Sequence, residues 1–152
     1  MPMCREELIH ALDAKKKAAC FDDSTVAKEK GKEFRLENKS KKNVCRVHID
    51  GCLMQDKRTK RCDYLFKVCE TEHYFLVELK GGEADKAIKQ IISTFDFINK
   101  KLKLAPEHFE GVVVSSGIPR AAEQKFRTLK EKCFREKKLR IQKESQKCQR
   151  II

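Results

Sequence analysis

The chain has 152 residues, of which 40% are hydrophobic and 38% are charged. This length suits one domain with an adequate core, and the apolar content is too high for a wholly disordered chain. The formal net charge of +12, from 35 Lys and Arg against 23 Asp and Glu, favours a polyanionic partner, either nucleic acid or an acidic membrane surface. No run of about 18 apolar residues is present, which argues against a membrane span.

Eight cysteines bear on the redox compartment and on metal binding. No two of them have the CxxC spacing by which one turn presents two thiolates to zinc. Residues 1–10 lack the apolar segment of a secretory signal, so a disulfide framework is not expected. We therefore expect free, partly buried thiols in a protein of the reducing cytoplasm, with a zinc site as the alternative.

The N-terminal part of the chain predicts one helix, followed by a stretch with little regular pattern. Within residues 5–20, Leu8, Ile9 and Leu12 fall on one face, which indicates a short amphipathic helix. Residues 22–43 are polar and rich in lysine. Within them, Phe34 and Leu36 alternate with polar residues, as they would in a short strand.

Three strands are predicted next. Within residues 43–54, Cys45, Val47 and Ile49 alternate with polar residues, which indicates a strand with one buried face. Residues 62–68 and 73–80 have the composition of a second and a third strand, and the polar turn between them is short. These two strands are therefore expected to form an antiparallel hairpin.

The rest of the chain predicts a helix, a strand and a second helix. Residues 83–103 carry apolar side chains at the spacing of one buried helical stripe, and residues 120–147 are expected to form the last helix. Between them, the apolar run within 109–117 indicates a fully buried strand. A hairpin-linked trio followed by a helical crossover predicts an α/β fold, in which a mixed central sheet of a three-stranded meander plus a fourth strand is flanked by helices.

Charged residues interrupt the second and third strands, where a sheet covered on both faces should be apolar. Asp63 shares a face with Leu65, while Glu78 and Lys80 share a face with Leu76. If Leu65 faces Leu76 in the hairpin, Asp63 faces Glu78. In the register two residues along, Asp63 faces Lys80. Either register gathers the three charges, with facing Cβ atoms about 5 Å apart.

Two carboxylates at this separation repel each other and favour a cation between them. Hard oxygen ligands select Mg²⁺ or Mn²⁺, which keep several water ligands. Such an ion lowers the pKa of a bound water and offsets charge on a phosphoryl oxygen, and a neighbouring lysine can hold the attacking water. The three charges therefore predict phosphodiester hydrolysis. Their non-catalytic interpretation is a solvated cross-strand cluster of salt bridges.

Asp63, Glu78 and Lys80, placed as D…ExK on consecutive strands, resemble the motif of the PD-(D/E)XK phosphodiesterases, which are restriction-endonuclease-like nucleases. The core of that family is a helix, a three-stranded meander, a helix and a strand, an order that matches residues 30–117 or so. The resemblance implies that Asp63 and Glu78 bind Mg²⁺ together with the carbonyl of Leu79. It also implies that Lys80 positions the attacking water.

Further residues are candidates for auxiliary roles at this site. Cys62 stands where the family motif has proline. Gln90 matches the glutamine that one subgroup of the family carries on the helix after the motif, and Glu37 or Glu33 could supply the acidic residue of the family's first helix. Asp50, at the end of the first strand, is either an additional metal ligand or the turn residue of an Asp-Gly pair.

The positive charge is concentrated near the C-terminus. Residues 120–150 hold 12 Lys and Arg against 4 acidic residues, a net charge of +8, which leaves +4 for the rest of the chain. This excess predicts binding of DNA or RNA phosphates by Arg120, Lys125, Arg127 and Lys130, although a solvated lysine-rich face has the same composition. With no Trp and two Tyr, stacking on single-stranded bases is not favoured, so duplex or branched DNA is the expected substrate.

We therefore expect residues 1–152 to form a single nuclease domain, with a core near 30–117 and a basic helix and tail over 118–152. The predicted activity is Mg²⁺-dependent endonucleolytic cleavage of DNA, of the restriction, junction-resolving or repair type. A homodimer or a larger partner would allow two strands to be cut. The alternatives are a catalytically inactive nucleic-acid-binding module of the same fold and an interaction protein whose basic tail binds acidic partners.

Overall fold

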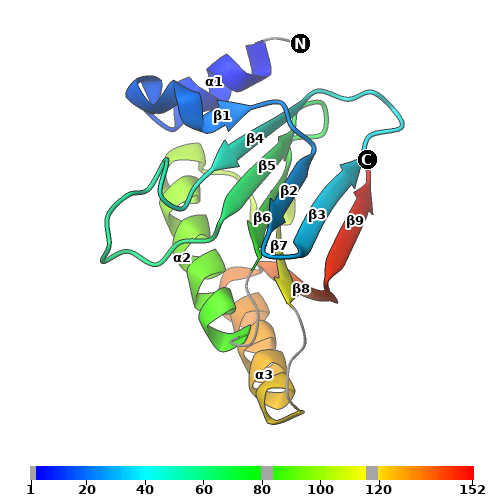
Figure 1. The fold of residues 1–152 in the computed structure, drawn as a ribbon. Coiled ribbons are helices and arrows are strands. Elements are labelled where there is room, and N and C mark those ends of the chain that lie inside the picture. Colours follow the sequence, from blue (N-terminus) through cyan, green and yellow to red (C-terminus); the bar gives the residue numbers. More distant parts are fainter. Residues whose placement is uncertain (1–2, 80–83, 116–119) are drawn as a thin grey trace.

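The computed structural model describes residues 3–79, 84–115 and 120–152. The helices in these ranges are α1 (Met3–Ala11), α2 (Ala84–Leu102), α3 (Arg120–Lys137) and the 3-10 helices Lys15–Cys20 and Pro106–His108. The strands are β1 (Phe21–Asp22), β2 (Val26–Glu29), β3 (Lys32–Glu37), β4 (Val44–His48), β5 (Tyr64–Val68), β6 (His73–Glu78), β7 (Phe109–Ser115), β8 (Arg140–Ser145) and β9 (Lys147–Ile151). They form a larger and a smaller sheet (Figure 1).

The larger sheet contains, within the described residues, six strands in the order β1-β4-β5-β6-β7-β8. Strands β4, β5 and β6 form an antiparallel meander, and β7 lies parallel to β6 after the crossover through α2. The predicted α/β class, the meander and the fourth strand are therefore confirmed. Strands β1 and β8 extend the sheet at its two edges beyond that prediction.

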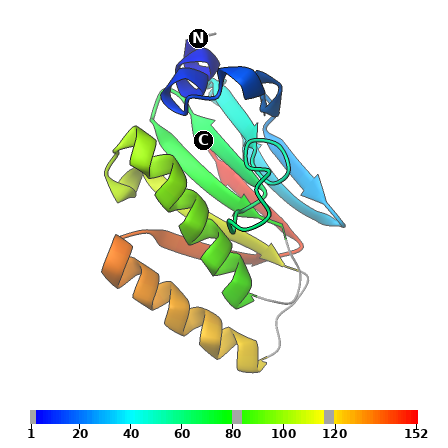
Figure 2. The same ribbon diagram turned by 90° about the vertical axis from the view of Figure 1, so that its left-hand side faces the viewer.

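Helices α2 and α3 lie side by side against one face of the larger sheet (Figure 2). The predicted apolar stripe of α2 is buried there, and Ile88, Ile91 and Ile98 are each 0% exposed. Gly111 of β7 permits this close approach, because a Cβ atom at that position would lie 2.8 Å from Cγ2 of Ile91. The stripe of one helix and the inner face of the meander thus make the main core.

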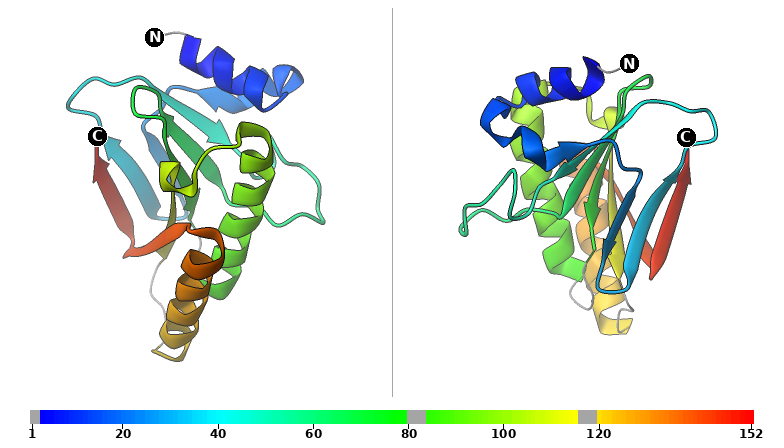
Figure 3. Two further views of the ribbon diagram at one scale, coloured as in Figure 1. Left: turned by 180° about the vertical axis from the view of Figure 1, so that it is seen from behind. Right: turned by 45° about the horizontal axis from the view of Figure 1, so that its top comes forward.

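The opposite face of the larger sheet is covered by the smaller sheet, β2-β3-β9, and not by helices as predicted (Figure 3). Phe34 of β3 is fully buried, with its ring centroid 5.2 Å from that of Phe66 and 5.6 Å from that of Phe75. The alternation of Phe34 and Leu36 therefore marks a real strand. Its partners were not apparent, because β9 joins it from the far end of the chain.

The predicted last helix, 120–147, is wrong beyond Lys137. Lys138 has a left-handed backbone conformation (φ 58°), which ends α3 and turns the chain. Leu139 and Ile141 are then buried as β8 pairs with β7, and β9 pairs with β3. The tail that we expected to be basic helix instead supplies one strand to each sheet.

Two disulfides tie the N-terminal segment to the larger sheet. Cys4 of α1 is bonded to Cys69, which follows β5, and Cys20 is bonded to Cys52 in the turn after β4. The expectation of free thiols therefore fails for these four residues, because pairs 65 and 32 positions apart leave no mark in local spacing. Disulfides persist in oxidising compartments, so the prediction of a reducing cytoplasm is wrong.

The four remaining cysteines, Cys45, Cys62, Cys133 and Cys148, are free and buried. Burial in apolar surroundings raises the pKa of Cys45 to about 12 and the pKa values of Cys133 and Cys148 to about 11. These thiols are protonated at neutral pH and pack as small apolar side chains. None of the helices described is both long and apolar enough to cross a membrane.

Candidate functional site

The β5–β6 hairpin brings Asp63 and Glu78 together. Leu65 faces Leu76 and Tyr64 faces Val77 in the antiparallel register. This is the first of the two predicted registers, so the alternative that set Asp63 against Lys80 is wrong. Asp63 directly precedes β5 and Glu78 is the last residue of β6, which places the two carboxylates at the same end of the hairpin.

Asp63 is held through both its side chain and its backbone, and it is 4% exposed. Its Oδ2 accepts a hydrogen bond from the backbone N–H of Leu79 at 2.8 Å. Its own N–H donates to the carbonyl of Val77 at 3.1 Å, and its carbonyl accepts from the N–H of Ile49 at 2.9 Å. The carboxylate is therefore oriented toward the end of β6 by contacts with both neighbouring strands.

Glu78 is 0% exposed and lies on the α2 side of β6, as do Tyr74 and Leu76. Both carboxylates act on the buried Cys62 thiol, whose pKa is raised mainly by burial and further by the negative charges of Glu78 and Asp63. Both carboxylates thus act on one buried point between the sheet and α2.

Thr94 links α2 to the residue before Asp63. Its hydroxyl accepts a hydrogen bond from the Cys62 N–H at 2.8 Å and donates to the carbonyl of Gln90 at 2.9 Å. Thr94 is 0% exposed, and it is not among the residues predicted for the site. A threonine within an otherwise apolar helical stripe was the available signal.

Gln90, the auxiliary residue implied by the family resemblance, lies on α2 one turn before Thr94. Its side-chain Oε1 is buried and accepts no hydrogen bond from any group that the structure describes. A buried amide oxygen in this state is available to accept a hydrogen bond from a ligand or a water, or to bind an ion. Gln90 thus lies on the helix after the motif, and its auxiliary role stays a prediction.

Asp50 approaches Asp63 through its backbone, since its N–H lies 3.4 Å from the Asp63 carbonyl oxygen. Its side chain, 43% exposed, is directed to Arg61, with Oδ1 accepting from Nε at 2.7 Å. Asp50 precedes Gly51, whose φ of 76° belongs to the turn that an Asp-Gly pair favours. Its contacts match the turn interpretation.

The two glutamates considered for the family's first helix lie on strand β3. Glu33 pairs with Lys28 at 3.4 Å and Arg35 at 3.2 Å, and Glu37 accepts a hydrogen bond from Gln149 at 3.0 Å. Both belong to the smaller sheet, on a strand and not on a helix. The structure therefore gives neither residue the setting that the resemblance implied.

The donors that Asp63 and Glu78 offer fit a magnesium ion chemically. Carboxylate oxygens are the ligands that Mg²⁺ prefers, and this ion needs few protein ligands because it keeps its waters. Across the described ranges, no group of three or more His, Cys, Asp and Glu side chains could hold a metal, so a site here would rest on two carboxylates and backbone oxygen. Lys80, the third residue of the predicted motif, lies outside the described residues.

The predicted phosphate-binding residues lie on α3. Lys125 reaches Asp85 at the start of α2, with Nζ 3.2 Å from Oδ2, and Arg127 is exposed. Lys130 donates to the side-chain oxygen of Gln142 on β8 at 3.4 Å. The side chain of Arg120 is not among those described. Lys125 thus stands at the end of α3 that adjoins the start of α2, the helix that covers the carboxylates.

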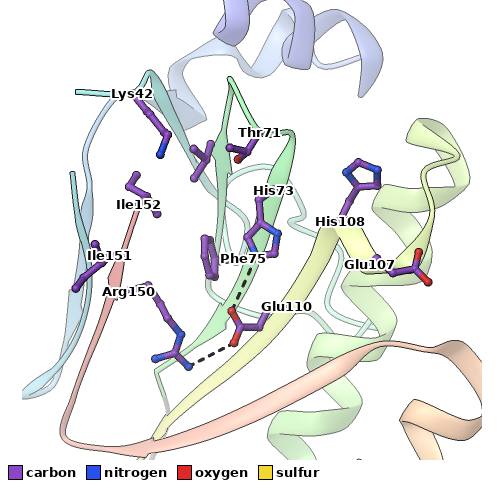
Figure 4. A pocket seen from close by; sticks show the side chains of 11 residues that line it. Lys42, Thr71, His73, Phe75, Glu107, His108, Glu110, Arg150, Ile151 and Ile152 are labelled. Carbon is purple, nitrogen blue, oxygen red and sulfur yellow. Dashed lines mark hydrogen bonds and ion pairs between the residues drawn. The ribbon is translucent and has the colours of Figure 1, made fainter. Parts of the chain in front are cut away.

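A separate charged cluster lies at the opposite end of β6. His73, Glu110 and Arg150 face one another across a pocket of about 550 Å³ between the two sheets (Figure 4). Burial would raise the pKa of Glu110, but its interactions with His73 and Arg150 outweigh burial and leave that pKa below its ordinary value. The Glu110 oxygens lie 4.0 Å from His73 Nε2 and 3.4 Å from Arg150 Nη2. This cluster is well placed to join β6, β7 and β9.

No protein-family model, curated protein or solved structure matches this chain. The resemblance to the PD-(D/E)XK nucleases therefore depends on Asp63, Glu78, Lys80 and the order of the surrounding elements.

Proposed function

We propose that the chain is a nuclease that hydrolyses phosphodiester bonds and requires Mg²⁺, which Mn²⁺ can replace. Its proposed catalytic residues are Asp63, Glu78 and Lys80. One observation carries this proposal: two almost fully buried carboxylates lie at the same end of one hairpin. Burying two like charges together is costly, so a protein that keeps both gains from a cation between them. The order of meander, α2 and β7 supports a restriction-endonuclease-like core for the fold.

In this proposal each residue has a distinct role. Asp63 and Glu78 supply oxygen ligands together with the carbonyl of Leu79, and the Leu79 N–H keeps Asp63 oriented. The metal, when bound, would lower the pKa of a water and offset charge on the phosphoryl oxygen. Lys80 would hold the attacking water by a hydrogen bond and present its positive charge to the phosphate.

The expected substrate is duplex or branched DNA, bound through its phosphates by α3. Lys125, Arg127 and Lys130 are the described candidates, with Arg120 at the start of the helix. Contacts with phosphates give affinity without sequence preference. A second copy of the chain or a larger partner would supply the second active site needed to cut both strands.

A second candidate is a catalytically inactive nucleic-acid-binding module of the same fold. Glu78 favours it, because a side chain that is 0% exposed offers no surface to a substrate phosphate in this conformation. This candidate retains the basic α3 surface and loses the metal-dependent step. It predicts nucleic-acid binding that does not change on substitution of Lys80.

The two candidates are separated by a cleavage assay. Plasmid, linear and branched DNA, and RNA, are incubated with the protein in Mg²⁺ or in EDTA, beside the Lys80→Ala and Asp63→Asn variants. The nuclease proposal predicts cutting by the wild type in Mg²⁺ only, and no cutting by either variant. Equal cutting by all three proteins would contradict the assignment of Asp63 and Lys80 to the active site. Binding without any cutting would favour the inactive module.

A further inference from the structure

Phe134, near the end of α3, has an exposed aromatic ring surrounded by positive charge. Its residue exposure is 43%, the largest of the aromatic side chains in the described part of the chain. Lys138 Nζ and Arg140 Cζ each lie 5.8 Å from the ring centroid. Two hollows, of about 600 and 350 Å³, border the ring, and Arg140 and Gln142 line both. An exposed ring with open space beside it can accept a flat ligand.

The cations around this ring are not engaged elsewhere. Arg135, Lys138 and Arg140 are exposed, and none of them forms an ion pair with a carboxylate that the structure describes. By contrast, Lys137 of the same helix turn pairs with Asp96 at 3.0 Å. Three positive charges thus face solvent beside one aromatic ring, a combination suited to an anionic ligand with flat groups.

Carboxylates near the ring do not cancel this charge. Glu131 borders the larger hollow, and Glu107 and Glu110 border the smaller one. Glu110 is already paired with Arg150 at 3.4 Å. Lys130 adds a further positive charge to the larger hollow. The region therefore stays positive overall.

We infer that Phe134, Arg135, Lys138 and Arg140, here called the Phe134 surface, bind single-stranded nucleic acid. One base stacks on the Phe134 ring, and the three cations contact the flanking phosphates. A duplex hides its base faces inside the stack, so it can use the cations but not the ring. An acidic peptide likewise gains from the charges and has no flat group repeated along its chain.

This inference builds on the proposed nucleic-acid substrate but uses a different part of the molecule. Lys125 marks the end of α3 next to the start of α2, and Phe134 lies nine residues further along the helix, about 13 Å away. The two helices run side by side (Figure 2). The Phe134 surface would therefore hold a segment that flanks the reacting phosphate, such as an unpaired arm of a branched substrate.

The test measures binding without cleavage. Fluorescence anisotropy in EDTA follows a labelled oligothymidylate of about 20 nucleotides and the matching duplex, with wild type, Phe134→Ala and Phe134→Tyr. We expect Phe134→Ala to weaken binding of the single strand about 10-fold, the loss expected when one base no longer stacks on a ring, and to leave duplex binding unchanged. Phe134→Tyr retains the ring and should retain the affinity.

Phe97 provides a matched control, because it is 36% exposed and has Lys101 Nζ 5.2 Å from its ring centroid. Phe97→Ala should bind the single strand like the wild type. A second variant, Lys138→Gln, should lower the salt dependence of binding by about 0.7 in log–log slope, the value for one single-strand phosphate contact. Thermal unfolding of each variant confirms that the fold is retained.

Three results would overturn the inference. They are equal loss of single-strand and duplex binding in Phe134→Ala, an equal loss in Phe97→Ala, and Phe134-dependent binding of a polyglutamate peptide in place of the oligonucleotide. Asp63→Asn separates this inference from the proposed function. That variant should bind the single strand normally. Absence of cleavage by the wild-type protein in Mg²⁺, together with Phe134-dependent binding, would reject the nuclease proposal alone.

Discussion

The Asp63 carboxylate binds the peptide unit that joins Glu78 to Leu79, with its Oδ2 accepting the Leu79 N–H at 2.8 Å. This contact fixes one acidic side chain against the backbone of the other acidic residue. It couples the start of β5 to the end of β6 beyond the last residue pair of the ladder. The orientation of Asp63 is thus built into the hairpin, and further support comes from α2 through Thr94 and Cys62.

Thr94 is expected to stabilise the start of β5. Thr94→Val keeps the shape of the side chain but removes the acceptor of the buried Cys62 N–H, which should lower the free energy of unfolding by about 1–3 kcal/mol in urea titrations. Thr94→Ser retains the hydroxyl and serves as the control. Identical unfolding midpoints for the Val and Ser variants would show that this hydrogen bond contributes nothing.

The Cys20–Cys52 disulfide is expected to stabilise the fold mainly by restricting the unfolded chain. It joins residues 32 positions apart, and a loop of this size predicts a contribution of about 2–4 kcal/mol. The paired Cys20→Ser and Cys52→Ser substitutions should lower the urea midpoint of the oxidised protein. An oxidised variant as stable as the wild type would contradict the pairing.

Glu110 is expected to make the free energy of unfolding fall as the pH is lowered into the acid range. Its pKa lies below the ordinary 4.5, so its interactions stabilise the fold above that pH and are lost as the pH falls through the lower folded-state value. Glu110→Gln should cost about 1 kcal/mol at pH 7 and flatten the loss of stability below pH 4.5. Unfolding measured from pH 7 to pH 3 checks both effects. Parallel curves for the two proteins would contradict this role for Glu110.

The hairpin at the site could be predicted because its pattern is local. The short turn between the two strands leaves few registers, and facing Leu65 with Leu76 buries both. That register by itself places Asp63 opposite Glu78. Helix α2 could also be predicted from the sequence, since its apolar stripe repeats over many turns.

Strands β8 and β9 could not be predicted, because their sequences are mostly polar and also suit a helix. Within β8, Ile141 is the one buried position, and β9 likewise buries only Cys148. What makes them strands is pairing with β7 and β3, which are distant in sequence. Such pairing is a tertiary effect that overrides local propensity.

Features that depend on surface exposure, or on pairing between distant residues, also could not be predicted from the sequence. Phe134 is a large apolar residue of α3, yet it is 43% exposed near the end of that helix. The Cys4–Cys69 bond joins positions that only the folded sheet brings together. Thr94, in contrast, could have been found, because a threonine interrupts an otherwise apolar stripe.

We propose that Asp63 and Glu78 form a metal-dependent phosphodiesterase site. Its most direct test is the rate of DNA cleavage in Mg²⁺ by the wild type, Glu78→Gln and Glu110→Gln. Glu110 is the matched control, because it is a partly buried glutamate on the adjacent strand β7 that lies at the other end of the sheet.

Glu78→Gln is expected to lose cleavage by about 100-fold or more, since removal of a metal ligand costs several kcal/mol of transition-state stabilisation. Glu110→Gln should cleave at the wild-type rate under conditions where both variants are folded. Cleavage by Glu78→Gln at the wild-type rate, or an equal loss in both variants, would contradict the assignment of the site.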